Sequence, residues 1–303
     1  MAKHKNKSSG ISPGRLLLTG FVGLAGLGMS ITMLLQGTDI ALFDPKGPIA
    51  QQQHGLMVLS AAVLLSVAVP TLILLYFFAW KYRESNQKAT YDPTSRPGKL
   101  SVFSMWAVPS FFMLVLALVM WPATHRLQPQ KLIAANAKPL TIQVVAMRWK
   151  WLFIYPDQNI ATVNFVQVPT DTPVQFELSA DDTPMSSFWI PHLGGQLYAM
   201  TGHVNRLNLL AVNPGDYQGS SAEINGAGFA GMKFIARAST KESFDLWVKQ
   251  VKQSPNALDT TEYAKLLAPS ENNPAAFYSQ AQSDLYDNML LKYNGSHDHA
   301  GHQ

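Results

Sequence analysis

The stretch YQGSSAEINGAGFAGMKF, from Tyr217 to Phe234, has the composition of a loop that holds a ligand. It combines small residues and paired glycines with Glu223 and Met232, and it lies between segments with the pattern of β-strands. However, the stretch contains neither Cys nor His, and the whole chain of 303 residues has no cysteine. Disulfides, thiolate metal sites and a cysteine nucleophile are therefore excluded, because each requires a thiol.

Other residues that could do chemistry give no stronger site. His192 and His203 flank LGGQLYAMTG, but two imidazoles fall short of the roughly three or four protein ligands that a metal usually takes. Ser221 has no G-x-S-x-G context and no evident base nearby in the sequence. The glycines of GAGFAG precede a strand and do not open a helix, which argues against a phosphate loop. We expect no catalytic, cofactor-binding or metal-binding residue in this chain.

The composition points to a membrane protein. Only 14% of the residues are charged, against about 25% in an average soluble domain. Three apolar segments, Leu16–Leu35, Gly55–Trp80 and Ser101–Trp121, approach or exceed the roughly 20 residues that a membrane helix needs. The first segment has the basic start of a secretory signal but is long for one, so cleavage and retention as a helix both remain open.

The basic residues give the orientation. The loop between the last two apolar segments carries Lys81, Arg83, Lys88, Arg96 and Lys99, which makes this loop cytoplasmic by the positive-inside rule. Everything after Trp121 then lies outside, which in a bacterium is the periplasm. Residues 1–124 contain ten Lys and Arg against four Asp and Glu, whereas residues 125–303 contain thirteen against fifteen. The basic excess therefore reflects membrane topology, and we expect no nucleic-acid partner.

The pattern changes near Pro139. Short segments rich in β-branched residues, such as LTIQVVAM and PVQFELSA, are separated by turn residues and predict a β-sandwich. In MRWKWLFIYP, the alternating Trp149, Trp151, Phe153 and Tyr155 are expected on one strand face. After Ser239, KESFDLWVKQVKQ and AAFYSQAQSDLYDNMLLKY have helical spacing.

The expected organisation has five parts. They are a basic start with an apolar signal or helix (1–38), a membrane helical hairpin (39–124), a β-sandwich (125–239), C-terminal helices (240–292) and a disordered tail (293–303).

Three stretches carry a resemblance to a known family. SSFWIPHLGGQLYAMTGHVNRL, NPGDYQGSSAEINGAGFAGMKF and MRWKWLFIYPDQNIATVN resemble subunit II of the haem-copper oxidases. The resemblance covers the chain from about Leu42 onward. It implies a two-helix membrane hairpin, an extracytoplasmic all-β cupredoxin-like sandwich and a C-terminal helical extension.

In the cytochrome c oxidase branch, the resemblance implies a dinuclear copper centre held by two Cys, two His, a Met and a Glu backbone carbonyl. The positions of this chain that fall on those ligands are Ser186, Ser221, Glu223, Asn225, Phe229 and Met232. Ser221 and Asn225 replace the two Cys, and Ser186 and Phe229 replace the two His. One carbonyl and one thioether cannot hold copper without the bridging thiolates, so we expect the replacing residues to fill or hydrogen-bond the cavity.

The loss of the ligands, together with ALFDPKG and the C-terminal helices, resembles the bo-type ubiquinol oxidase branch. The resemblance implies a subunit II of a proton-pumping oxidase that takes electrons from ubiquinol and reduces oxygen to water. It places the haems and copper in subunit I and leaves this chain without a cofactor. The implied partners are subunit I, other oxidase subunits, the lipid bilayer of the bacterial inner membrane and, through the complex, ubiquinol.

Two alternatives remain, a copper-binding subunit II of cytochrome c oxidase and a free-standing membrane-anchored binding domain. The missing cysteines disfavour the first alternative. The chain also departs from its branch at two positions. Thr38 stands where family members often carry a lipid-bearing Cys, and Val102 stands where they commonly carry a proton-pathway Glu.

Overall fold

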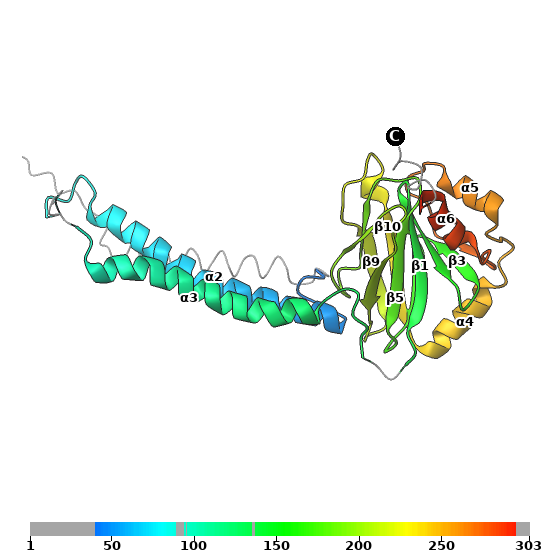
Figure 1. Ribbon diagram of the computed structural model, residues 1–303, viewed down its shortest axis with the longest axis horizontal. Helices are drawn as coiled ribbons and strands as arrows, with labels where there is room; N and C mark the ends of the chain where they lie inside the picture. Colours follow the sequence, from blue (N-terminus) through cyan, green and yellow to red (C-terminus); the bar gives the residue numbers. More distant parts are fainter. Residues whose placement is uncertain (1–39, 89–93, 95, 135–136, 295–303) are drawn as a thin grey trace, which may run out of the picture. The chain divides into compact units, whose positions relative to one another are not determined.

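The computed structural model describes residues 40–88, 94, 96–134 and 137–294. The predictions for residues 1–38, including Thr38, and for the tail beyond residue 294 lie outside the described residues. The chain divides into two compact units, Met1–Asp44 and Pro45–Gln303. The second unit contains all of the described helices and strands (Figure 1).

Two long helices open the second unit, α2 (Pro48–Lys81) and α3 (Lys99–Arg126). Both are long enough to span a membrane, and their most apolar windows have mean hydropathies of 2.5 and 2.2. Nearly all of their side chains are accessible, and the buried exceptions are Ala50 and Ala123 near the two periplasmic ends. Helices that are apolar on every side suit a lipid environment or contact with other apolar helices.

The following domain consists of two packed sheets. The six-stranded sheet contains, in spatial order, β11 (Ala276–Tyr278), β3 (Ile160–Val163), β2 (Lys150–Tyr155), β1 (Leu140–Met147), β5 (Val174–Ala180) and β8 (Asn205–Leu209). The five-stranded sheet contains β4 (Phe165–Pro169), β10 (Lys233–Ser239), β9 (Gly215–Ser221), β6 (Ser186–Trp189) and β7 (Leu197–Ala199). The pairs β1–β5 and β4–β10 are parallel, and the other pairs are antiparallel. The predicted β-sandwich is confirmed.

Aromatic rings fill the space between the sheets. Phe188 stacks on Phe234 with ring centroids 5.1 Å apart, and Trp151 meets Phe188 edge to face at 5.3 Å. Phe153 lies 5.2 Å from Phe234. Such pairs contribute about 0.5–1.5 kcal/mol each beyond their buried area. The aromatic row predicted from the sequence is therefore a core feature.

The prediction for Trp149 was wrong. This residue lies in the turn between β1 and β2 with a positive φ of 66°, so it is not part of the β2 row. Its ring packs against the backbone at Gly228, where an added Cβ would lie only 2.4 Å from the Trp149 ring. A tight hairpin turn has interrupted the alternation, because the left-handed backbone turns the side chain away from the strand face.

The C-terminal segment contains α4 (Lys241–Val251), α5 (Thr260–Leu267) and α6 (Leu285–Asn294) (Figure 1). Helices α5 and α6 cover the outer face of the six-stranded sheet, whereas α4 packs Phe244 and Val251 against the core between the sheets. The Thr240 hydroxyl accepts the Ser243 N–H at the start of α4, and an Asp259 carboxylate oxygen accepts the Glu262 N–H at the start of α5. Both contacts satisfy N–H groups that a helix start leaves without a partner.

The prediction of a helix across AAFYSQAQSDLYDNMLLKY was correct only in its second half. Residues Ala276–Tyr278 form β11, which pairs antiparallel with β3, and the helix starts at Leu285. The backbone of β3 would otherwise be an open sheet edge, and pairing with β11 satisfies its N–H and C=O groups. This gain depends on a strand more than 100 residues earlier in the chain, so local helical periodicity does not indicate it.

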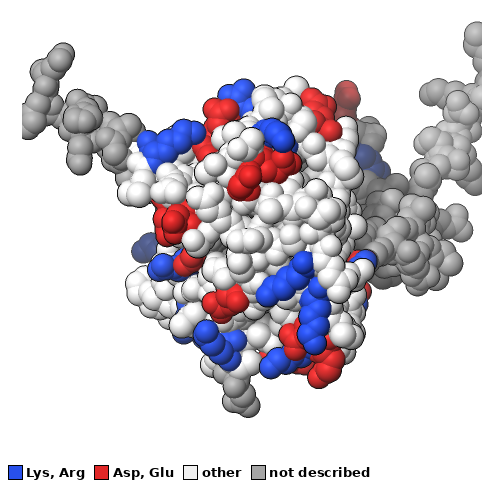
Figure 2. All heavy atoms as spheres, turned by 90° about the vertical axis from the view of Figure 1, so that its right-hand side faces the viewer, with Lys and Arg blue, Asp and Glu red and all other residues white. Residues whose placement is uncertain are grey.

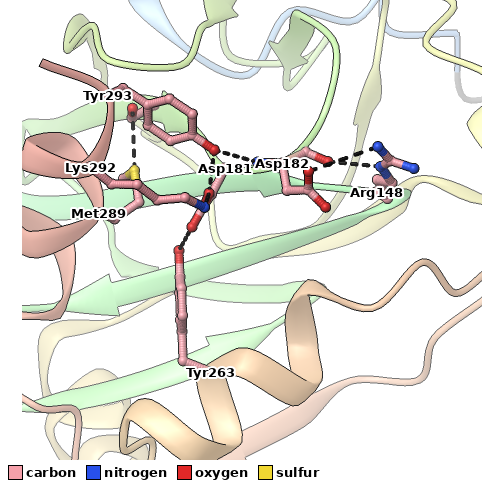
Figure 3. A network of polar contacts seen from close by, with 8 residues as sticks. Arg148, Asp181, Asp182, Tyr263, Met289, Lys292 and Tyr293 are labelled. Carbon is pink, nitrogen blue, oxygen red and sulfur yellow. Dashed lines mark hydrogen bonds and ion pairs between the residues drawn. The ribbon is translucent and has the colours of Figure 1, made fainter. Parts of the chain in front are cut away.

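One buried carboxylate joins two of these helices to the sandwich (Figure 3). Asp181, directly after β5, is 2% exposed and accepts hydrogen bonds from the hydroxyls of Tyr263 (2.8 Å) and Tyr293 (2.6 Å) and from Lys292 Nζ (2.9 Å). Burial raises the pKa of Tyr263, and the hydrogen bond to Asp181 raises the pKa of Lys292. Both groups therefore stay protonated at neutral pH and remain donors. We call these four residues the Asp181 clamp.

Helix α2 starts against the sandwich. The Lys46 N–H donates to the His192 carbonyl at 2.8 Å, and the Ala50 N–H donates to the Leu193 carbonyl at 3.2 Å. The second bond satisfies a first-turn N–H that has no partner inside the helix. An added Cβ at Gly47 would lie 2.5 Å from a backbone carbonyl oxygen of the segment after β8. Only glycine therefore allows the chain to approach the sandwich this closely.

The substitution Asp181→Asn should loosen α5 and α6 by about 2 kcal/mol, because hydrogen bonds to charged groups contribute about 1.5–3 kcal/mol and the amide retains one acceptor oxygen. Hydrogen exchange of the full chain, followed at the amides of α5 and α6, measures this loss. Asp182→Asn is the matched control, because the Asp182 carboxylate forms a surface ion pair with Arg148 at 3.8 Å, and the substitution keeps the backbone bonds of this residue to Arg148 and Tyr293. In Asp182→Asn, the loss of stability of α5 and α6 should stay below about 1 kcal/mol. Equal effects of the two substitutions would contradict the clamp.

The substitution Gly47→Ala should cost about 1–3 kcal/mol at the start of α2, because the methyl group overlaps the Leu210 carbonyl oxygen. The expected result is faster hydrogen exchange at the amide of Ala50. Gly55→Ala, in the same helix with no atom within 4 Å of the added Cβ, should leave that amide unchanged. Unchanged exchange in Gly47→Ala would show that the contact is dispensable.

Candidate functional site

The candidate site is the loop that joins β9 to β10, residues 222–232, together with the start of β6. Two backbone bonds hold the loop in place: the Ser221 N–H donates to the Met232 carbonyl (3.1 Å), and the Ala222 N–H donates to the Ser187 carbonyl (2.9 Å). Gly226 has a φ of +122°, a conformation that residues with a side chain rarely adopt. The stretch identified in the sequence is therefore a tightly constrained loop beside β6.

Three of the six predicted positions meet directly. The Asn225 side-chain N–H group donates to Ser186 Oγ at 2.8 Å and contacts Met232 Sδ at 3.2 Å. Ser186 and Met232 are fully buried, and Asn225 is 7% exposed. Ser186 Oγ in turn donates to the Pro184 carbonyl at 3.2 Å. We call Ser186, Asn225 and Met232 the Asn225 cluster.

The other three positions lie around this cluster. The buried Ser221 hydroxyl donates to the Glu223 backbone carbonyl at 3.0 Å, so this carbonyl oxygen is used inside the protein. Phe229 is half-buried and opens a short 3-10 turn, Phe229–Gly231. In the described part of the chain, no hydrogen bond or ring contact joins the Phe229 side chain to the Asn225 cluster.

The donor atoms of this site do not fit copper. The site offers two hydroxyls, one carboxamide, one thioether and one backbone carbonyl that already accepts a hydrogen bond. Copper sites in proteins are built on thiolates and imidazoles, and neither occurs here. Asn225 Oδ1 is buried without a partner among the described residues. What the site forms is a neutral hydrogen-bonded cluster inside the sandwich.

The two histidines considered from the sequence are not a pair. His192 is buried, its ring lies 5.5 Å from that of Tyr217, and its carbonyl accepts the Lys46 N–H at the start of α2. His203 is exposed. Over the described ranges, no group of three or more His, Asp or Glu side chains is placed to hold a metal ion.

Sequence reasoning missed two polar features. The Asp181 clamp has no local signal, because Asp181-Asp182 after a strand reads as an ordinary solvated turn. The second feature is the bond between the edge strand β8 and the chain after α3: both the backbone N–H and the Nδ2 of Asn208 donate to the Pro129 carbonyl, at 3.0 and 3.1 Å. Each depends on residues far apart in the sequence.

On one face of the periplasmic domain, the charged side chains of both signs are mixed (Figure 2). On the face in Figure 2, basic and acidic side chains are interspersed, with no large area of one sign. The ion pair of Arg237 with Asp216, at 2.6 Å, is an example of such mixing on β10 and β9. A nucleic-acid footprint would be a continuous basic patch.

Comparison with known families gives two matches. Residues 157–239 match the family described as cytochrome c oxidase subunit II, periplasmic domain. Residues 252–297 match the family described as the COX aromatic-rich motif. The two apolar helices followed by such a domain make the chain a bacterial inner-membrane protein with a periplasmic C-terminal domain.

Individual proteins extend the match over most of the chain. The cytochrome bo(3) ubiquinol oxidase subunit 2 of Pseudomonas putida is 44% identical over 89% of this chain and 87% of its own length. The ubiquinol oxidase subunit 2 of Acetobacter aceti is 43% identical over 88% of this chain and 87% of its own length. One similar solved structure is the periplasmic domain of subunit II of cytochrome oxidase of Bradyrhizobium japonicum, which is 22% identical. The match covers 40% of this chain and 96% of that domain, with a TM-score of 0.37. With relatives this similar over most of both lengths, and with a β-sandwich that follows two apolar helices, the chain belongs to the subunit 2 family of the bo(3)-type ubiquinol oxidases.

Proposed function

We propose that this chain is a copper-free, non-catalytic subunit II of a proton-pumping ubiquinol oxidase. It packs on subunit I, which carries the haems, the haem-copper centre and the quinol chemistry. The complex oxidises ubiquinol and reduces oxygen to water. The single observation that carries this proposal is the donor set of the Asn225 cluster and Ser221, which lacks every group that holds copper strongly.

The chemistry of these residues supports a structural role. Amides, hydroxyls and a thioether hydrogen-bond or fill space, but none of them carries electrons between a soluble donor and the membrane. The relatives in Pseudomonas putida and Acetobacter aceti are named as ubiquinol oxidases, and ubiquinol is a donor that reaches an enzyme through the lipid phase. A donor in the membrane has no need of a metal centre in the periplasmic sandwich.

The membrane helices support packing on a larger partner. In α2 and α3, Ala50 and Ala123 are the buried residues, and large apolar side chains such as Leu65, Phe103 and Met113 are more than half exposed. Surfaces of this kind are covered by lipid or by other membrane helices. The sandwich is fixed to the start of α2, so a hairpin that docks on another subunit would also hold the sandwich over it.

The first test is to rebuild the copper ligands. The combined substitutions Ser221→Cys, Asn225→Cys, Ser186→His and Phe229→His should give a coloured protein that binds copper, because they add thiolates and imidazoles next to Met232 and the Glu223 carbonyl. Metal analysis and the visible spectrum of the purified chain measure the result. The unchanged protein should bind copper only at trace level.

A matched control carries the two Cys substitutions without the two His substitutions. It should bind copper weakly and without the same spectrum, because both imidazole ligands are missing. A four-substitution protein that folds and stays colourless and copper-free would count against the proposed copper ancestry of this loop. Stoichiometric copper in the unchanged protein would overturn the proposal itself.

The second test concerns the complex. A tag on this chain should co-purify a haem-bearing subunit and ubiquinol-oxidase activity from solubilised membranes. Asn225→Ala should lower the thermal stability of the complex, because it removes the bond to Ser186, worth about 1 kcal/mol. Turnover per haem should stay unchanged. Recovery of the chain without any haem protein would favour a free-standing binding domain, and a large loss of turnover per haem in folded Asn225→Ala would contradict the non-catalytic role.

A further inference from the structure

A cavity of about 260 Å³ lies where the chain after α3 passes the start of α2 and the edge strand β8. It is distinct from the Asn225 cluster, and none of the residues that line it belongs to that cluster. The lining residues that the argument uses are Arg126, Lys131, Leu132, Ile133 and Asn208. All of them belong to the second compact unit.

The cavity carries positive charge. Arg126, in the last turn of α3, and Lys131, five residues later, both line it, and no Asp or Glu does. The Arg126 Nε donates to the Pro122 carbonyl at 3.3 Å, which leaves its terminal guanidinium nitrogens available. Within the described ranges neither cation has an ion-pair partner. An anionic group is therefore the expected occupant beside these side chains.

Asn208, in the edge strand β8, fixes one wall of the cavity. It is 3% exposed, and its backbone N–H and its Nδ2 both donate to the Pro129 carbonyl, at 3.0 and 3.1 Å. Its Oδ1 is buried behind this wall and is closed to a ligand in the cavity. The two bonds to Pro129 hold the chain that carries Lys131 against the edge of the sandwich.

The position of the cavity is at the membrane boundary. It adjoins the last turn of α3 and the first turns of α2, which are the periplasmic ends of both apolar helices. Its rim includes apolar side chains, among them Leu132, which is 59% exposed, and the half-buried Ile133. Lipid headgroups lie at this depth, just outside the hydrocarbon core. The volume is slightly below the roughly 300–1,000 Å³ that encloses a drug-sized ligand, so it suits a headgroup with the acyl chains outside.

We propose that this cavity binds the headgroup of an anionic phospholipid of the phosphatidylglycerol type. The phosphate lies beside Arg126 and Lys131. Choline and ethanolamine headgroups each carry a cation that Arg126 and Lys131 repel, whereas the glycerol headgroup is uncharged. The lipid links the membrane anchor to the edge of the sandwich, and this role does not depend on the proposed oxidase chemistry.

The test uses native mass spectrometry of the full chain in its purified complex, released from micelles that contain equal amounts of phosphatidylglycerol, phosphatidylethanolamine and phosphatidylcholine. Phosphatidylglycerol should be retained preferentially. Arg126→Gln with Lys131→Gln should lower its retention roughly 25-fold, because each charge near the membrane surface contributes about fivefold. Each single substitution should give about a fivefold loss, which keeps the test decisive if the double variant assembles poorly.

Lys138→Gln is the matched control, because Lys138 lies in the same connection but does not line the cavity. It removes the same charge and should leave lipid retention unchanged. Lipid bound elsewhere in the complex is common to all variants and cancels in this comparison. A loss in Lys138→Gln equal to that of the cavity variants would overturn the site, because it would show an unspecific effect of surface charge.

The role of the charge is tested with phosphatidylmethanol, which has the charge of phosphatidylglycerol but no hydroxyl in its headgroup. It should be retained about as well as phosphatidylglycerol, because the two cations bind the phosphate. A loss of its retention to the level of phosphatidylcholine would contradict recognition by charge. An excess of inorganic phosphate should not displace the lipid, because free phosphate gains nothing from the apolar rim. Displacement by phosphate, equal retention of all lipids, or no lipid lost on neutralising both cations would each overturn the proposal.

Discussion

The structure depends on one central strand, β2, that is buried on both faces. In β2, Trp151, Phe153 and Tyr155 face the core between the sheets, whereas Leu152 and Ile154 face the C-terminal helices. A strand of this kind cannot be left with either side in water, because burying its large apolar side chains supplies much of the stability of the domain. The C-terminal helices are therefore part of the fold and not an appendage to a finished sandwich.

Polar contacts at the rim of this arrangement then fix the position of each helix. The Lys150 ammonium, whose pKa is lowered by burial, donates to the Leu266 and Ala268 carbonyls at the end of α5, both at 2.8 Å. The Asp181 clamp holds α5 and α6 at the same end of the strands, because Asp181 follows Ala180, the partner of Ala146, and Lys150 pairs with Met147. Burial of apolar side chains holds the helices on the sheet but does not fix their orientation, because the hydrophobic effect is non-directional. The hydrogen bonds fix the orientation, because they require a defined geometry. The covering helices thus have a defined orientation on the sheet.

The constrained loop between β9 and β10 follows from the same packing. Gly228 lies against the Trp149 ring, and Gly219 lies so close to Phe234 that an added Cβ would overlap its ring at 2.1 Å. The loop keeps its shape through backbone bonds and ring contacts, which do not require a metal. The Asn225 cluster occupies the interior with neutral groups, and buried polar groups are tolerated there because most of them are hydrogen-bonded.

The sequence by itself determined the two membrane helices and the sandwich. These elements follow from local properties of the sequence, namely apolar runs of membrane length and short β-branched segments such as LTIQVVAM. Such properties, like the absence of cysteine, can be recognised without knowledge of the tertiary contacts. The resemblance to subunit II then identified which side chains of the loop to examine, and three of them, Ser186, Asn225 and Met232, lie in direct contact.

Only the tertiary structure decided what depends on distant partners. The β11 pairing, the turn position of Trp149, the Asp181 clamp and the unpaired oxygen of Asn208 each arise where segments far apart in the chain meet. Each of these features affects the stability of the fold through a specific polar atom, which either gains or lacks a hydrogen bond once it is buried. Local periodicity predicts which side of a helix or strand is apolar. It does not predict which hydrogen-bond donor or acceptor from a distant segment will lie against that element, so the sequence alone could not reveal these features.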